Sequence, residues 1–425
     1  MAIGRRDMLK GIGGIAMTAA LTPVDPRASV AALGRLARGT ELPRKQDFDL
    51  TAGYTFINAA YTHPIPRPAA DAMRDYLDQR NRLAMPRPGS GGGDGRGPSA
   101  KALFAELINA KPTEVAYVSS TSVGENLVVN ALGLDRATIS NVVTDWLHFD
   151  GALMHLLELK RHGLDVRVVK PTRDFRIDLK DLERAIDRRT KLVELSSTTM
   201  YNGFQHDLKA VCDLAHAHGA YVYADIIHSA GAEPFDVKAS GVDFAACSSF
   251  KWLMGDYGLG FLYARDDLLD KIRRPQIGYY QAATMVGHEP PFNDAGATQA
   301  VDWTFKTDAT GHFESGTIAG ALGAGLVASL AYLKEIGVAN IQAYRQPLLR
   351  KLRDEMPRLG FTCVTPAEST GGIITFARKD LATSDVAARL DRAKVNVRIA
   401  DTWLRVSPSI YNDMADVDRL LEALS

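Results

Sequence analysis

The sequence has few cysteines, and charge of neither sign is in excess. Its 425 residues include only three cysteines, Cys212, Cys247 and Cys363. Their odd number and their spacing argue against a disulfide framework and against a cysteine-built metal site. Fifty basic residues balance fifty acidic ones, so no overall field attracts nucleic acid or an anionic membrane. We therefore expect no metal and no nucleic-acid partner.

Long apolar runs are also absent, and the N-terminus carries a short one. Arg5 and Arg6 precede the weakly apolar residues 11–21, and two prolines follow. That run, of about 11 residues, is too short to span a bilayer, so we expect no stable membrane insertion. Residues 1–29 resemble a twin-arginine export signal, which predicts a periplasmic or exported protein. The alternative is a basic tail ahead of a short helix, on a cytoplasmic protein.

The rest of the chain predicts a globular α/β protein. Hydrophobic residues make up 46% of it, and its length suits two or three domains. Apolar segments of strand and helix length alternate between residues 100 and 225, which predicts a mostly parallel sheet with helices on both faces. The predicted helices are 100–110, 123–132, 151–162, 179–187 and 208–218, and the predicted strands are 114–118, 139–144, 166–170, 191–196 and 221–225.

A lysine between two apolar runs is the main catalytic candidate. Lys251 follows a run that ends at Ser248, and a second run, 259–263, comes after a glycine-containing turn. Burial between two strands lowers the pKa of a lysine toward that of a free amine, which can attack an aldehyde. We interpret Lys251 as a Schiff-base lysine. A lysine that merely marks the solvated end of a strand is the alternative.

Polar residues at two other strand ends suit the same chemistry. Asp225 ends an apolar strand, and His228 follows three residues later. At the edge of the sheet where ligands bind, an acid can pair with a protonated pyridine nitrogen, as pyridoxal phosphate requires. His228 could reach a phenolic oxygen or cover a ring. Residues 119–122 are four hydroxyl residues at a predicted helix start, which favours phosphate binding over simple capping.

Five short motifs in one order resemble a known family. They are SSTSVGEN at 119–126, DIIH at 225–228, SSFKWLMG at 248–255, FESGT at 313–317 and LRVSPSIYN at 404–412. The sequence is similar to class V aminotransferases of the fold type I pyridoxal-phosphate enzymes, which include cysteine desulfurases, kynureninases and isopenicillin N epimerase-like proteins. The resemblance implies an N-terminal segment at 30–68, a large cofactor domain at 69–310, and a connecting helix with a smaller α+β domain at 311–425.

The resemblance also implies roles for individual residues. Thr121 and Ser122 would hold the cofactor phosphate, Ser248 would also contact the cofactor, and Trp146 would stack on its ring. Thr317 would reach the phosphate of a second subunit, unless it only caps a helix. The aromatic, loop-rich segment 265–310 would cross the interface of a homodimer with shared active sites. The glycine-rich run 89–97 lacks the flanking residues of a phosphate loop and is predicted to be a plain loop.

Two residues are candidates for substrate binding. Asn58 belongs to a turn that the family places at the substrate mouth. Arg405 lies inside an apolar strand, where an unpaired guanidinium is costly and a carboxylate is its natural partner. The resemblance makes Arg405 the clamp for the substrate carboxylate, and a structural salt bridge is the alternative. His206, His216 and His218 lack a converging ligand set and are interpreted as surface residues.

The sequence therefore predicts a pyridoxal-phosphate enzyme acting on an amino acid or related primary amine, with Lys251, Asp225 and His228 as catalytic residues. An aminotransferase reaction is the first expectation, and an epimerase, a lyase or decarboxylase, and an oxygen-using oxidase stay open. A ligand-binding protein that kept the fold is the non-enzyme alternative. A desulfurase is disfavoured, because no cysteine lies between Gly371 and Arg405.

Overall fold

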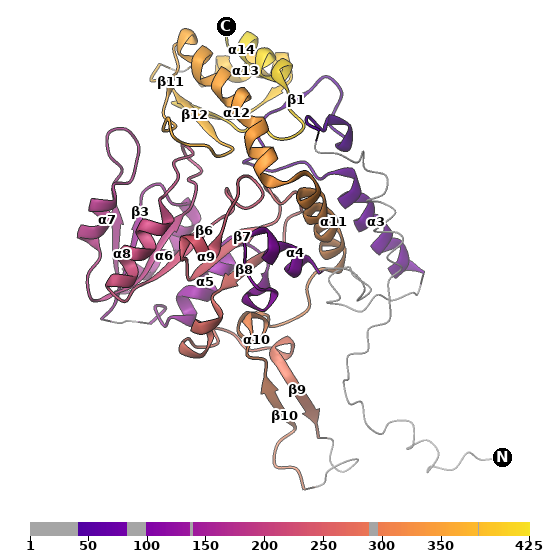
Figure 1. Ribbon diagram of the computed structural model, residues 1–425, viewed down its shortest axis with the longest axis vertical. Helices are drawn as coiled ribbons and strands as arrows, with labels where there is room; N and C mark the ends of the chain where they lie inside the picture. Colours follow the sequence, from indigo (N-terminus) through magenta and orange to yellow (C-terminus); the bar gives the residue numbers. More distant parts are fainter. Residues whose placement is uncertain (1–40, 83–98, 137–138, 289–295, 381) are drawn as a thin grey trace, which may run out of the picture.

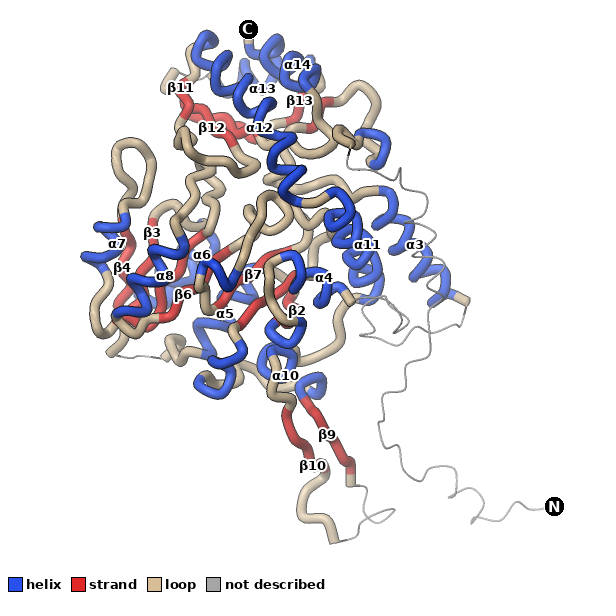
Figure 2. Tube along the Cα trace, in the orientation of Figure 1, coloured by secondary structure: helices blue, strands red, loops and turns tan. Residues whose placement is uncertain are grey.

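The computed structural model describes residues 41–82, 99–136, 139–288, 296–380 and 382–425 (Figure 1). The expected export signal, 1–29, and the glycine-rich run, 89–97, lie outside these residues. The described chain has a larger part around a seven-stranded sheet and a smaller C-terminal part (Figure 2). Helix α11 (Gly320–Ile336) packs into the core of the larger part, and α12 (Val338–Glu355) leads from there into the smaller part.

The large sheet has the strand order β2-β8-β7-β6-β5-β3-β4. All neighbouring strands pair in parallel except at β8, which is antiparallel to both β2 and β7. This confirms the predicted mostly parallel α/β sheet. The strands are β2 (Val115–Val118), β3 (Asn141–Asp145), β4 (Asp165–Val169), β5 (Thr190–Ser196), β6 (Tyr221–Asp225), β7 (Phe244–Ser248) and β8 (Gly260–Ala264).

Helices cover both faces of this sheet, and the alternation of side chains along each strand explains why. Val142 and Val143 are neighbours on β3, yet they belong to two different hydrophobic clusters, one on each face. Phe104 lies in the cluster with Val143, whereas Leu127 lies in the cluster with Val142. The helices are α4 (Ala100–Leu107), α5 (Thr121–Ala131), α6 (Asp150–Arg161), α7 (Leu179–Ala185), α8 (Leu208–Ala217) and α9 (Val237–Ser240).

The C-terminal part has its own core and a four-stranded antiparallel sheet in the order β11-β12-β15-β14. Ile57, from near the start of the described chain, packs into this core. The strands are β11 (Thr362–Cys363), β12 (Ile374–Ala377), β14 (Arg398–Ala400) and β15 (Trp403–Val406), and the helices are α12 (Val338–Glu355), α13 (Thr383–Ala393) and α14 (Met414–Leu424).

The segment 395–399 does not form one continuous strand. Its first two residues form β13 (Val395–Asn396), which pairs in parallel with β1 (Thr55–Phe56). After Val397 the chain changes sheets and becomes β14, which pairs with β15. The residues Val-Asn-Val-Arg-Ile alternate without interruption, so nothing in the local pattern marks the point where the chain leaves one sheet for the other.

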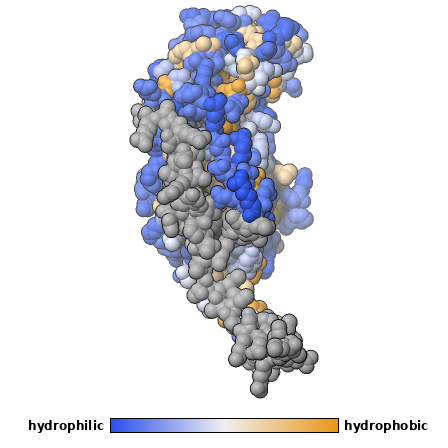
Figure 3. All heavy atoms as spheres, turned by 90° about the vertical axis from the view of Figure 1, so that its right-hand side faces the viewer, coloured by the Kyte–Doolittle hydropathy of each residue, from blue (hydrophilic) through white to orange (hydrophobic). Residues whose placement is uncertain are grey.

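Two further features lie outside the two sheets. Helix α3 (Arg67–Asn81) packs along α11 (Gly320–Ile336), and a hairpin of β9 (Ala282–Gly287) and β10 (Val301–Phe305) projects from the body near α10 (Ala309–Phe313; Figure 1). The hairpin replaces part of the segment expected to be loop-rich. Most of the described surface in Figure 3 is hydrophilic, with apolar residues in small separate groups.

None of the described helices is by itself long and apolar enough to cross a membrane. Helix α11 passes that test only together with the chain that follows it to Leu359, and the two segments meet at an angle of 71°. Much of α11 is buried in the protein core.

Candidate active site

Lys251 lies in a tight turn directly after β7. Two hydrogen bonds close this turn, from Met254 N to Lys251 O (2.8 Å) and from Gly255 N to Ser249 O (2.9 Å). Met254 adopts a positive φ of 57°, which is uncommon for a residue with a side chain. A Cβ atom on Gly231 would lie 2.4 Å from Trp252 O, so the chain after β6 packs directly on the lysine turn. The backbone of the turn therefore fixes the position from which the Lys251 side chain extends.

The Lys251 amine lies within hydrogen-bonding distance of a histidine, and both side chains line one small cavity. Its Nζ lies 3.1 Å from His228 Nε2. Burial lowers the pKa of Lys251 to about 8; Asp225 opposes this shift, and Arg405 adds to it. A lysine with this pKa has a sizeable neutral fraction near neutral pH, so its nitrogen can act as a nucleophile or as a base.

Asp225 and His228 complete the polar wall. Asp225 ends β6, and its Oδ1 accepts a hydrogen bond from Ile227 N at 2.9 Å. Burial raises the pKa of Asp225, while His148 and Lys251 act against that shift. Burial holds the pKa of His228 well below its usual value, aided by the charges of Lys251 and Arg405, so the imidazole is neutral. His228 Nδ1 is buried with no partner in the described structure.

Hydroxyl groups meet at the other end of the cavity, where α5 begins. Ser120 caps the helix by accepting a hydrogen bond from Val123 N at 3.2 Å. Thr121 and Ser248 hold each other: Thr121 N donates to Ser248 Oγ (2.8 Å), and Ser248 N donates to Thr121 Oγ1 (2.9 Å). This exchange joins the helix start to β7, beside the lysine turn. Amides at a helix start favour a bound phosphate.

These groups surround one cavity of about 140 Å³. Its walls come from α5, the turn after β3, and the ends of β5, β6 and β7. The lining residues are Ser120, Thr121, Ser122, Phe149, Ser196, Met200, Asp225, Ile227, His228, Ser248, Phe250 and Lys251. An amine, an acid for a ring nitrogen, an imidazole with an unpartnered nitrogen, and a phosphate cradle are all present. The site therefore fits pyridoxal phosphate.

The structure places Trp146, the residue predicted to stack on the cofactor ring, outside the Lys251 cavity. Trp146 does not line this cavity; it is half-exposed, and Lys170 Nζ lies 5.5 Å from the centre of its ring. Trp146 N donates to Val169 O at 3.0 Å, so its backbone continues the pairing with β4 at the edge of the sheet. Phe149, directly before α6, lines the cavity instead. The sequence signal that could have identified Phe149 is an aromatic residue directly before the start of a predicted helix.

The two predicted substrate residues lie at the C-terminal sheet: Arg405 is part of its strand β15, and Asn58 pairs with Ser407, directly after that strand. Arg405 is buried on β15, and its Nη1 donates to Met200 O at 2.8 Å. Burial lowers the pKa of Arg405 to about 10, and Arg398 adds to this effect. No described carboxylate forms an ion pair with it, which argues against the structural salt bridge. Asn58 is buried; its Nδ2 donates to Asn396 Oδ1 at 3.1 Å, and its Oδ1 has no partner.

Thr317 is exposed and lies apart from the Lys251 cavity of its own chain. It lines a neighbouring cavity of about 310 Å³, together with Ser119, Gly258 and Glu314. Neighbouring residues line the two cavities, since Ser119 lines this one and Ser120 lines the Lys251 cavity. Within the described chain, Thr317 therefore takes no part in the Lys251 site.

The histidine prediction is partly wrong. His206 is buried, and its Nε2 lies 3.2 Å from Asp145 Oδ2, so it is not a surface residue. His216 is exposed, as predicted, and pairs with the buried Asp243 at 2.8 Å. A local reading of helix and loop positions could not show that these imidazoles turn toward acids of the neighbouring strand ends.

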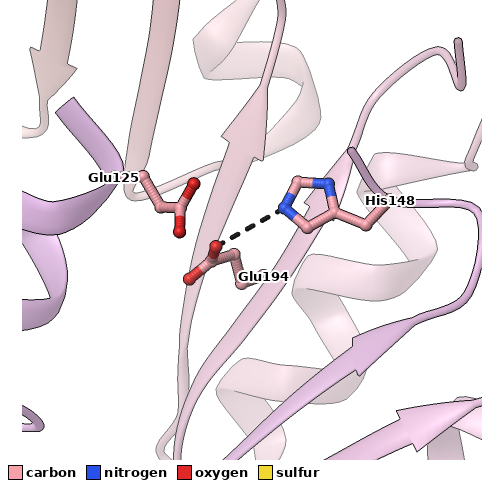
Figure 4. A group of neighbouring side chains, drawn as sticks. All are labelled: Glu125, His148 and Glu194. Carbon is pink, nitrogen blue, oxygen red and sulfur yellow. Dashed lines mark hydrogen bonds and ion pairs between the residues drawn. The ribbon is translucent and has the colours of Figure 1, made fainter. Parts of the chain in front are cut away.

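Sequence reasoning also missed a buried group behind the cavity. Glu125 of α5, Glu194 of β5 and His148 converge there, and their nearest ligand atoms all lie within 4.8 Å of one another (Figure 4). His148 Nε2 lies 3.4 Å from Glu194 Oε1, and His148 Nδ1 lies 2.8 Å from the Oγ of Ser196, which lines the cavity. Glu125 Oε1 lies 2.9 Å from Nδ1 of His155.

Burial raises the pKa of both Glu125 and Glu194 to about 8, and the two carboxyls lie next to each other. The same three side chains have the types that can hold a metal ion. With no metal, the raised pKa values favour at least one protonated carboxyl at neutral pH. The chain of contacts from Ser196 to His155 then runs through groups that can share a proton.

This buried pair predicts how stability depends on pH. The unfolded chain ionises both carboxyls near pH 4.5, whereas the folded chain keeps them neutral up to about pH 8. Their contribution to stability is therefore present below pH 4.5 and lost as the pH rises to about 8. We expect Glu194→Gln to reduce the fall in Tm between about pH 5 and pH 8.5, by several degrees. Thermal unfolding at the two pH values measures this.

Glu106→Gln is the matched control, because Glu106 is exposed and pairs with Lys334 on the surface. It should leave the pH dependence of Tm unchanged. Equal pH slopes for the wild type and Glu194→Gln would contradict the assignment of raised pKa values to this pair.

Known proteins are similar to this chain over the region that contains the site. A family model described as Aminotransferase class-V matches residues 56–420. A probable cysteine desulfurase from Methanothermobacter thermautotrophicus is 28% identical over 82% of this chain and 84% of its own. A cysteine desulfurase from Haloferax volcanii is 27% identical over 95% of this chain and 96% of its own.

Solved structures show the same fold. The apo structure of a cysteine desulfurase from Thermococcus onnurineus NA1 superposes with a TM-score of 0.77 at 23% identity, covering 91% of this chain and 98% of that one. A cystine C-S lyase in complex with its product cysteine persulfide superposes with a TM-score of 0.72 at 18% identity, covering 88% and 97%.

Proposed function

Because the chain belongs to the aminotransferase class-V family and is a pyridoxal-phosphate enzyme, we propose that it acts on an α-amino acid, with Lys251 as the residue that holds the cofactor and then moves the Cα proton. The observation that carries this proposal is the pairing of the Lys251 amine, at a pKa of about 8, with the neutral His228 in one cavity. The ligand-binding alternative does not hold for a member of this enzyme family.

Pyridoxal phosphate supplies an electron sink for the carbanion at Cα. Asp225, with its buried carboxyl at the end of β6, would hold the proton on the ring nitrogen. His228 would bond the phenolic oxygen, and Ser120, Thr121, Ser122 and the α5 amides would bind the phosphate. Phe149, at the cavity wall, would cover the ring. Lys251 Nζ, fixed by its tight turn, would take the proton from Cα and return it.

The position to which Lys251 returns the proton would decide the product. Return to the cofactor carbon gives transamination, our first proposal for this chain. A second candidate is cleavage of a β-carbon–sulfur bond after the same proton removal, and the similarity to proteins named cysteine desulfurases favours it. A test is to add amino acids one at a time to the purified holoenzyme while following the cofactor spectrum, keto acids and sulfide. No spectral change with any amino acid would contradict the proposal.

Formation of a persulfide on the protein is disfavoured. Cys212 and Cys247 are buried, and Cys363 is half-buried on β11, where Arg353 Nη1 lies 3.4 Å from its Sγ. Burial raises the pKa of the Cys363 thiol. Only Asp401 and Thr402 separate β14 from β15 directly ahead of Arg405. A turn of two residues without cysteine offers no arm that carries a thiol to the cofactor.

Arg405 is proposed to bind the α-carboxylate of the substrate, because its guanidinium is buried, has a free Nε and lacks an ion pair among the described residues. We expect Arg405→Met to lower kcat/KM for amino acids by about 2 to 4 kcal/mol, on the order of 30- to 1000-fold, and to change little for the corresponding decarboxylated amines. Steady-state kinetics on one amino acid and its amine, in both proteins, measures the difference.

Arg392→Met, at an exposed arginine of α13, is the control for the loss of a charge in the same domain. It should behave as the wild type. Equal losses for the amino acid and the amine in Arg405→Met would show that Arg405 acts on structure and not on the substrate.

We also propose that the active form is a homodimer in which Thr317 completes the site of the second copy. Three observations support this: Thr317 is exposed, it does not line the Lys251 cavity of its own chain, and Met285, Val286 and Trp303 of the β9–β10 hairpin are exposed. We expect sedimentation at the mass of two chains. A fully active monomer would contradict it.

A further inference from the structure

Two arginines lie directly opposite each other on neighbouring strands of the C-terminal sheet. Arg398 of β14 pairs with Arg405 of β15, and on the other side of β15 Thr375 of β12 also pairs with Arg405. In antiparallel strands, directly opposed side chains lie on the same face of the sheet, and like charges there repel. The three side chains therefore form one row, and the row contains two positive charges that cost stability.

This row faces the Lys251 cavity. Thr375 Oγ1 donates to Tyr201 O at 2.7 Å, and Arg405 Nη1 donates to Met200 O at 2.8 Å. Met200 is itself part of the cavity wall. The charges reach the reacting amine as well: after burial, Arg405 and Arg398 both help to lower the pKa of Lys251. Both guanidiniums thus lie close enough to the site to act on a bound substrate.

No acid in the described chain balances these two charges. Arg405 has a carbonyl oxygen as its partner, and its Nε is buried without one. Arg398 is exposed and forms no ion pair with a described acid; the rings of Tyr61 and Trp403 each lie 5.8 Å from its guanidinium carbon, and its charge acts on the phenol of Tyr201. Contacts to ring faces at this distance use no N–H donor, so the N–H groups of Arg398 stay available for an anion.

Arg405 and Arg398 differ in burial, which suggests different roles for the two side chains. Arg405 is buried beside Met200, deeper in the site, whereas Arg398 is exposed. The two rings near Arg398 come from different parts of the chain: Tyr61 lies in the turn after β1, and Trp403 begins β15. If Arg405 takes the α-carboxylate, the second cation of the row is left for a group farther along the substrate side chain.

We propose that Arg398 binds a second anionic group, so that the preferred substrates are α-amino acids whose side chain carries a carboxylate, sulfinate, sulfonate or phosphate group. The inference rests on the proposed function, in which Arg405 holds the α-carboxylate. It adds a substrate class. A dianion between the two guanidiniums removes the repulsion within the row and makes charge-assisted hydrogen bonds to both.

The test compares substrates of similar size that differ in side-chain charge. In the wild-type holoenzyme, kcat/KM is measured for aspartate, glutamate, cysteine sulfinate, cysteate and phosphoserine, and for the neutral alanine, 2-aminobutyrate and norvaline. The anionic set should be preferred, and the best of its members identifies which anion fits. Arg398→Gln should lower kcat/KM for the anionic set by about 10- to 100-fold more than for the neutral set, with the difference mainly in KM.

Binding without turnover gives an independent measurement. Succinate and propionate lack the amine and cannot react, so calorimetric titration of the holoenzyme reports recognition alone. Succinate should bind more tightly than propionate, and Arg398→Gln should remove that difference. Arg392→Gln, at an exposed arginine of the same domain, should retain it.

The outcomes separate this inference from the proposed function. Turnover of neutral amino acids at least as efficient as that of anionic ones would overturn the second anion and leave the α-amino acid assignment standing. Equal losses for both sets in Arg398→Gln would show a structural role and also overturn it. A cofactor spectrum that responds to no amino acid of either set would reject the proposed function itself.

Discussion

Lys251→Ala is expected to abolish turnover while leaving the fold intact. The amine lies 3.1 Å from His228, in a turn whose shape depends on backbone hydrogen bonds and not on the lysine side chain. In the proposed mechanism, removing it takes away both the attachment of the cofactor and the base for the Cα proton. We expect a loss of at least about 1000-fold in kcat, about 4 kcal/mol in the barrier, with Tm within a few degrees of the wild type.

Two measurements check this result. Borohydride reduction followed by mass spectrometry should place a cofactor adduct on Lys251 in the wild type, and no adduct should form in the variant. Lys238→Ala, at an exposed lysine of α9, is the control and should retain both activity and adduct. Full turnover by Lys251→Ala without added amine would remove this residue from the mechanism.

The main elements of the fold could be predicted because each one has a strong local signal. Strand β6 runs from Tyr221 to Asp225 as predicted, since five residues that suit a strand end on a carboxylate. The grouping of Lys251, Asp225 and His228 in one cavity was also predictable. The carboxyl ends of parallel strands meet at one edge of a sheet, so residues at those ends come together whatever the loops do.

The remaining details depend on packing that the sequence does not display. Trp146 and Phe149 are both aromatic and three residues apart, and only the continued pairing of Trp146 N with Val169 O decides that Phe149 faces the cavity. Glu125 and Glu194 look like ordinary helix and strand residues. Their raised pKa values arise because α5 packs against the sheet beside β5 and leaves both carboxyls without water.

The group behind the cavity also bears on Asp225. Among the described residues, the titratable groups whose charge acts on Asp225 include His148, which opposes its raised pKa, and Lys251. Asp225 in turn raises the pKa of Glu194. Asp225, which would hold the proton on the ring nitrogen, is therefore one member of a coupled set, and its charge depends on how protons are distributed among its neighbours.

Asp225→Asn is expected to lower kcat by at least about 100-fold, about 3 kcal/mol in the barrier, while the cofactor still binds. The amide keeps the size of the carboxyl and can still accept a hydrogen bond from Ile227 N, so the end of β6 should not move. What is lost is the negative charge that keeps the ring nitrogen protonated, and without that proton the cofactor is a poor electron sink.

The measurement is designed to separate chemistry from binding. Cofactor occupancy is determined by absorbance and mass, and kcat is then compared at equal occupancy, with Asp213→Asn as the control at an exposed aspartate of α8. Exchange of the Cα proton with deuterated solvent should slow together with kcat, since both need the electron sink. A variant that turns over at the wild-type rate at full occupancy would show that Asp225 does not set the charge of the ring nitrogen.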